Sequence, residues 1–253
     1  MRVGLFGGGF KPFTTGHFSK LALSLAENDK TYLFYGISRP KKKRKAKGRA
    51  IGSREYTVEM ADSIYDIVKG ALERRYSGNI EVINPQPPGS PVSEIFGFIE
   101  AMKNGENHLG IDTNLIGELT VYGRRSDLDR YYYLNDPEKT EKYFGDLIST
   151  GRLKFDDAVD EDSEEPLERM MSALATTYEK AGSTDLKDYI NVSGTDLRGH
   201  VSVRDVENIK RYLPNFLSSE EEDQIVEILL GPEERLDMSE AYLRAFIKAT
   251  IRG

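Results

Sequence analysis

The sequence predicts an α/β protein in which a parallel sheet is covered by helices on both faces. A short apolar run at residues 3–6 is followed by a glycine-rich turn and then by a helical pattern at residues 18–26. A second apolar run follows at residues 31–37, which completes a strand–helix–strand unit in fewer than 40 residues. Both runs are apolar without alternation, as expected for strands that are buried on both faces.

Further elements follow along the chain. Arg54, just after Ser53, begins a helical pattern that extends to about residue 76, residues 80–83 form a third apolar run, and Ser90 and Pro91 have the composition of a helix start. Strands are expected at residues 119–123 and 189–192, with a charged loop or turn after the first of them. Helices are expected at about 166–180 and on both sides of residues 231–232, and the spacing of Ser219 and Glu222 is that of a capping box.

The overall composition limits the function classes. The chain has 253 residues, a formal charge of −7 and no cysteine, so disulfides and thiolate metal sites are excluded and nonspecific nucleic-acid binding by the whole surface is disfavoured. It lacks an apolar run of the roughly 18 residues that a membrane helix needs. We expect a cytoplasmic protein with no membrane partner, in which residues 1–215 form the main domain, about 131–185 an acidic insert, and 216–253 a helical extension that could support a homo-oligomer.

Two turns have the pattern of an anion-binding site. Residues 7–17, GGGFKPFTTGH, connect the first strand to the first helix, and residues 193–198, SGTDLR, follow the expected last strand. Backbone N–H groups at the start of a helix are unpaired and carry partial positive charge, so such turns bind phosphates. In an open parallel sheet, both turns can flank the crevice where the strand order reverses.

Residues 7–17 resemble the (H/T)xGH signature of the cytidylyltransferase-like nucleotidyltransferase superfamily, and residues 192–198 resemble its second signature, Ser-Ser/Gly-Thr-x-x-Arg. The resemblance covers about residues 1–215. It implies a Rossmann-like sheet and an enzyme that transfers a nucleoside monophosphate from an NTP to a phosphorylated small molecule and releases pyrophosphate. The second signature favours ATP slightly over CTP. Mg²⁺ is expected as cofactor, bound mainly through the triphosphate, with no protein metal ligands predicted.

The resemblance implies roles for the first signature. His17 donates a hydrogen bond to the α- or β-phosphate; the alternative is a histidine that caps its own helix. Thr14 stands where many members have a second histidine, so its hydroxyl can bind a phosphate but brings no charge, which leaves that task to Lys11 or the basic loop. Close approach of the backbone to the nucleotide is expected at Gly7, Gly8, Gly9, Phe10 and Gly16.

The second signature and the basic residues complete the expected site. Phosphate-binding roles are expected for Ser193, Gly194, Thr195 and Arg198. The basic loop at residues 39–49 gives further candidates for contacting the acceptor or a phosphate, together with two arginines: Lys41, Lys42, Lys43, Arg54 and Arg124.

Two other functions remain open. The protein could bind nucleotides without turnover, or, less in keeping with its charge, bind nucleic acid through the basic loop. The acidic residues at 156–165 lack metal-ligand spacing and are interpreted as a solvated loop.

Overall fold

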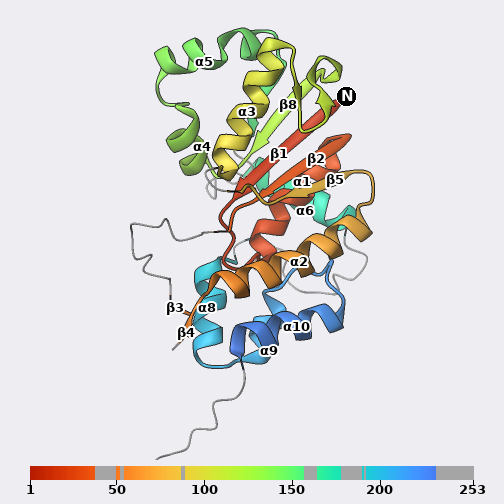
Figure 1. The fold of residues 1–253 in the computed structure, drawn as a ribbon, viewed down its shortest axis with the longest axis vertical. Coiled ribbons are helices and arrows are strands. Elements are labelled where there is room, and N and C mark those ends of the chain that lie inside the picture. The colour runs from red at the N-terminus through yellow and green to blue at the C-terminus, as the bar shows by residue number, and fades with distance from the viewer. Residues whose placement is uncertain are drawn as a thin grey trace, which may run out of the picture.

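The computed structural model describes residues 1–37, 50–51, 54–86, 89–156, 164–177, 190 and 192–231. Its centre is a sheet of five parallel strands in the order β5-β2-β1-β8-β9 (Figure 1). These strands are β1 (Arg2–Gly8), β2 (Lys30–Tyr35), β5 (Ile80–Ile83), β8 (Glu118–Tyr122) and β9 (Leu153–Asp156). The fold is the α/β, Rossmann-like fold that the sequence predicts.

Helices cover both faces of the sheet. One face carries α1 (Thr15–Glu27), α2 (Val58–Arg75) and α6 (Glu164–Thr177). The same apolar cluster continues into α8 (Gly194–Ser202), α9 (Val206–Arg211) and α10 (Ser219–Leu230), which lie beyond the strand ends beside α2 (Figure 1). The other face carries α3 (Pro91–Asn104), α4 (Arg125–Tyr132) and α5 (Pro137–Ser149). The described chain also has two small hairpins, β3 (Ala50–Ile51) with β4 (Arg54–Glu55) and β6 (Asn107–His108) with β7 (Ile111–Asp112), and the 3-10 helix η1 (Thr113–Leu115).

Alternation along the strands divides the apolar side chains into two cores. In β1, Phe6 faces the α1 side while Val3 and Leu5 face the α3 side, and all three are buried. In β2, Tyr35 joins the first core and Phe34 the second. Successive side chains of a strand point to opposite faces, so continuously apolar strands require this double cover.

Several helix boundaries follow their sequence signals. Ser90 caps α3 by accepting from the Ser93 amide at 3.1 Å, and Gly105 ends that helix with a φ of 68°. The capping box of α10, in contrast, is formed by Ser218 and Glu221, one residue earlier than the expected pair. The second helix of the predicted tail lies outside the described residues.

The structure corrects the expected start of α2. The helix begins at Val58, where the Thr57 hydroxyl accepts from the Met60 amide at 3.2 Å. Arg54 therefore does not lie at a helix start but in the short strand β4, paired with Ile51. The Thr57 hydroxyl satisfies an amide of the first turn that would otherwise be unpaired, and this sets the helix start.

Two further predictions are wrong. The residues after Gly123 form helix α4, with Arg124 at its N-cap, instead of a loop. Ile190 is helical and Val192 is irregular, so neither lies in a strand. The edge of the sheet is formed instead by β9, which pairs with β8 from Leu119↔Leu153 onwards.

The predicted insert, residues 131–185, and the predicted C-terminal extension, residues 216–253, both contain elements that pack with the main domain. β9 lies within residues 131–185, yet it is a strand of the central sheet. Arg74 of α2 makes an ion pair with Glu221 of α10, and Val226 of α10 is buried in the core that contains α1. None of the described helices is both long and apolar enough to cross a membrane.

Candidate functional site

A cavity of about 670 Å³ lies at the C-terminal ends of β1 and β8. These neighbouring strands mark the point where the strand order reverses, which is where open α/β sheets bind ligands. Four helices direct their N-terminal residues to its wall. Their contributions are Gly16 and His17 of α1, Ser90 to Val92 at α3, Gly123 and Arg124 at α4, and Ser193 and Gly194 at α8. Each such end carries partial positive charge, so the cavity suits an anion.

The two signature turns meet at this cavity, although they are separated by more than 170 residues. The Thr14 hydroxyl lies 3.2 Å from the Val192 carbonyl and 2.8 Å from His17 Nδ1, and it can donate its single proton to either. The Arg198 guanidinium donates to the Lys11 carbonyl at 2.9 Å. At Gly16 the two turns approach so closely that a Cβ would lie 2.3 Å from the Val192 carbonyl oxygen. These contacts fix the start of α8 against the start of α1.

His17 has a defined tautomer. The Thr14 amide donates to His17 Nδ1 at 3.0 Å, so we assign Nδ1 as unprotonated. Burial, followed by the charges of Lys20 and Arg124, lowers the pKa of His17 to about 3. A neutral imidazole then carries its proton on Nε2. His17 lines the cavity, and within the described part of the chain Nε2 has no hydrogen-bond partner. The residue therefore both caps its helix and can offer one N–H to a ligand.

The charged groups on the described wall of the cavity are two cations and one anion. Lys20 lies in α1 with only 4% of its surface exposed, and Arg124 and Asp127 come from the start of α4. A positive balance in this crevice contrasts with the negative net charge of the chain. Lys20 was not a sequence candidate. Its spacing could have indicated it, because a residue three positions after His17 on a helix lies on the same face as His17.

The other sequence candidates divide into three groups. Those that line the cavity are Gly7, Gly8, Gly9, Phe10, Gly16, His17, Arg124, Ser193 and Gly194. Those that the structure brings beside it without lining it are Lys11, Thr14, Thr195 and Arg198. Of these, Thr14 is fully buried. Those whose side chains lie outside the described part are Lys41, Lys42, Lys43 and Arg54.

The start of α8 is already capped by its own residues. The Ser193 hydroxyl accepts from the amides of Thr195 and Asp196, and it donates to the Asp196 carboxylate at 2.6 Å. The Ser193 amide donates to the same carboxylate, and these bonds lower the pKa of Asp196. A phosphate at this helix end would meet a fixed negative charge. The side chain of Arg198 donates to the Thr195 hydroxyl at 2.8 Å.

The described residues offer few metal ligands at the cavity. Within the described ranges, no group of three or more histidine, cysteine or acidic side chains is arranged so that it could hold a metal ion, and Asp127 is the carboxylate on the described cavity wall. Such a wall fits a Mg²⁺ ion that is held mainly by phosphate oxygens and water, with one carboxylate within reach.

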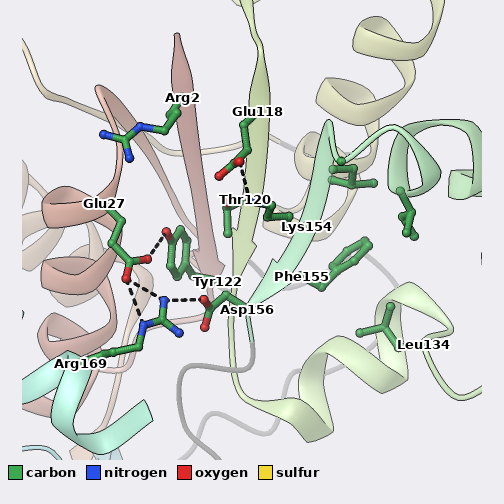
Figure 2. Close-up of a pocket in the computed structure, with 13 residues that line it drawn as sticks. Arg2, Glu27, Glu118, Thr120, Tyr122, Leu134, Lys154, Phe155, Asp156 and Arg169 are labelled. Carbon is green, nitrogen blue, oxygen red and sulfur yellow. Dashed lines mark hydrogen bonds and ion pairs between the residues drawn. The ribbon is translucent and has the colours of Figure 1, made fainter. Parts of the chain in front are cut away.

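A second hollow, of about 890 Å³, lies along β8 and β9 (Figure 2). Figure 2 shows Glu27, Tyr122, Asp156 and Arg169 directed toward one another. Arg169 donates to Glu27 at 2.6 Å and to Asp156 at 2.8 Å, and the Tyr122 hydroxyl donates to Glu27 at 2.9 Å. These charges are paired within the protein, so this hollow is the weaker candidate for an anion. Tyr122 lines both hollows.

No model of a known protein family matches the chain, and no curated protein matches it. The fold and the cavity therefore have to carry the functional argument.

Proposed function

We propose that the protein is a nucleotidyltransferase that transfers a nucleoside monophosphate from an NTP, with ATP favoured over CTP, to a phosphorylated small molecule. One observation carries the proposal: the two signature-like turns, remote in sequence, meet at one cavity at the reversal point of the sheet. The cavity has the size of a small-molecule site, and its wall combines helix N-termini with two cations.

The proposed reaction requires no covalent enzyme intermediate. An oxygen of the acceptor's phosphate forms a bond to the α-phosphorus of the NTP as the bond from that phosphorus to the bridging oxygen breaks. The electron pair of the broken bond stays on the leaving pyrophosphate. Because charge grows on the leaving oxygens, fixed donors and cations contribute most to the rate.

His17 and Arg124 are proposed to bind the phosphates. His17 offers a neutral Nε2–H, which donates without adding charge, and Arg124 offers a guanidinium that matches two phosphate oxygens. Mg²⁺, when bound to the triphosphate, would neutralise charge on its oxygens, and Asp127, the carboxylate on the described cavity wall, would be available to its water shell. Gly9 leaves room for the ligand, because a Cβ built there would have no neighbour within 4 Å.

The test is to incubate the protein with each NTP, Mg²⁺ and a panel of phosphorylated acceptors while following pyrophosphate. Two variants separate the roles of His17. In His17→Asn the amide oxygen can replace Nδ1 as acceptor for Thr14, but the donor at the Nε2 position is lost. In His17→Gln the amide nitrogen can replace that donor. We expect the rate to fall about a hundredfold in His17→Asn and less in His17→Gln. Absence of product with every NTP, in folded protein, would refute the proposal.

A nucleotide-binding protein without turnover is the second candidate. Thr14 favours it, because a hydroxyl brings no positive charge to stabilise the leaving pyrophosphate. Calorimetry showing tight NTP binding, with no product in the same mixtures, would select this candidate. Nucleic-acid binding through residues 39–49 stays a prediction, and it requires an affinity that falls steeply with salt.

A further inference from the structure

We propose that Lys20 binds the pyrophosphate part of the NTP beside His17, and so supplies the positive charge that Thr14 cannot. The inference rests on the proposed function and assigns a ligand contact to a residue outside both signatures. Lys20 lines the cavity while almost all of its surface is buried. A charge held out of water interacts more strongly with a bound anion, because little water screens the interaction.

The position of Lys20 brings its ammonium to the anion-binding end of α1. Side chains of a helix tilt toward its N-terminus, so a residue in the second turn reaches back over the first. The Lys20 Nζ accordingly donates to the Gly16 carbonyl at 3.3 Å. His17 lies three residues before Lys20 on the same helix face, and its pKa is lowered in part by the Lys20 charge. A ligand oxygen that accepts from His17 Nε2 is thus within the field of Lys20.

The first turn of α1 is arranged against the usual preference of a helix. It contains no acidic residue, whereas the first turns of α2, α3, α4, α5, α8, α9 and α10 each contain one or more. A cation near a helix N-terminus is repelled by the helix dipole. An anion bound there would interact favourably with both the dipole and the ammonium, so the arrangement is favourable in the liganded state.

Lys11, the lysine of the first signature, is less well placed. Lys11 does not line the cavity, and its carbonyl accepts the hydrogen bond from Arg198. Lys11 therefore contributes to the junction between the two turns through its backbone, while Lys20 is the lysine on the described cavity wall. The cation expected to contact the phosphates is therefore Lys20 of α1 and not Lys11 of the preceding turn.

The test measures binding of inorganic pyrophosphate by calorimetry, with sulfate as the control for a nonspecific anion. We compare the wild type with Lys20→Met, Lys20→Arg and the control Lys30→Met. Lys30 is the first residue of β2 and so lies at the N-terminal ends of the parallel strands, whereas the cavity lies at their C-terminal ends. Its substitution therefore changes net charge by the same amount away from the cavity. We expect Lys20→Met to weaken pyrophosphate binding about 10- to 100-fold, Lys20→Arg to weaken it less, and Lys30→Met to leave it unchanged.

A spectroscopic measurement on the wild type covers the case in which Lys20→Met does not fold. Saturating pyrophosphate should shift the NMR signals of the Lys20 ammonium and the His17 ring, and sulfate at equal concentration should shift them less. Unchanged pyrophosphate affinity in folded Lys20→Met, unmoved Lys20 signals, or no pyrophosphate binding by the wild type would each overturn the inference.

The outcome is separable from the proposed function. If pyrophosphate binding depends on Lys20 but no NTP gives product, the inference stands and the proposed reaction fails. If the wild type turns over an NTP and Lys20→Met does so at the same rate, the proposed reaction stands and the inference fails.

Discussion

Acidification should destabilise the protein through His17, and replacing this residue should remove the effect. In the folded state, the pKa of His17 is lowered from the ordinary 6.5 to about 3, chiefly by burial. The unfolded chain therefore binds one more proton than the folded protein between these two values, and unfolding becomes easier as pH falls below 6.5. This contribution to stability is complete above pH 6.5 and is lost progressively toward pH 3.

The size of the effect follows from the two pKa values. Each pH unit in this window changes the unfolding free energy by about 1.4 kcal/mol, so the wild type loses about 2 kcal/mol through His17 between pH 7 and pH 5. His17→Asn keeps an acceptor for the Thr14 amide but has no titrating ring. Urea unfolding of both proteins at several pH values gives the difference, in which contributions from His108 and the carboxylates cancel. Parallel stability curves for wild type and His17→Asn from pH 7 to pH 5 would refute the assigned burial and tautomer.

Two further predictions concern stability. Gly16→Ala should lower the unfolding free energy by about 2 kcal/mol or more, because its Cβ would meet two backbone carbonyls at 2.3 and 2.8 Å. Gly9→Ala, whose Cβ would have no atom within 4 Å, should leave the unfolding free energy nearly unchanged, and equal melting temperatures for the two variants would contradict this. Arg169→Met should lower the unfolding free energy by about 1 kcal/mol, since two carboxylates lose their partner, while Arg2→Met, whose exposed ion pair spans 3.9 Å, should have almost no effect in thermal unfolding.

The local parts of the fold could be predicted from the sequence because the signals there are local. The apolar runs of β1 and β2 and the Ser90 cap of α3 follow from short-range preferences. The edge strand could not be found in this way. Lys154 and Asp156 give β9 a polar appearance, which is typical of edge strands, and the β-branched residues at 190 and 192 resemble a strand more closely. Pairing across the sheet, which is a tertiary effect, decided between them.

The candidate site was predictable where a turn defines it and not where a helix face does. Gly7 to Gly9, His17 and Ser193 stand in turns with distinctive composition, and they line the cavity. Lys20, by contrast, looks like an ordinary polar residue in an amphipathic helix, and only the packing of its neighbours shows that it is buried. A sequence pattern gives the period of a helix but does not say which face is covered by a later segment of the chain.

The role of Thr14 illustrates why the two turns have to be understood together. Read alone, a hydroxyl in place of histidine suggests a weaker phosphate ligand. In the structure Thr14 is fully buried and its amide donates to the ring of His17. Its hydroxyl contacts both that ring and the Val192 carbonyl just before α8. One small residue thus sets the tautomer of the candidate donor and holds the second turn in place.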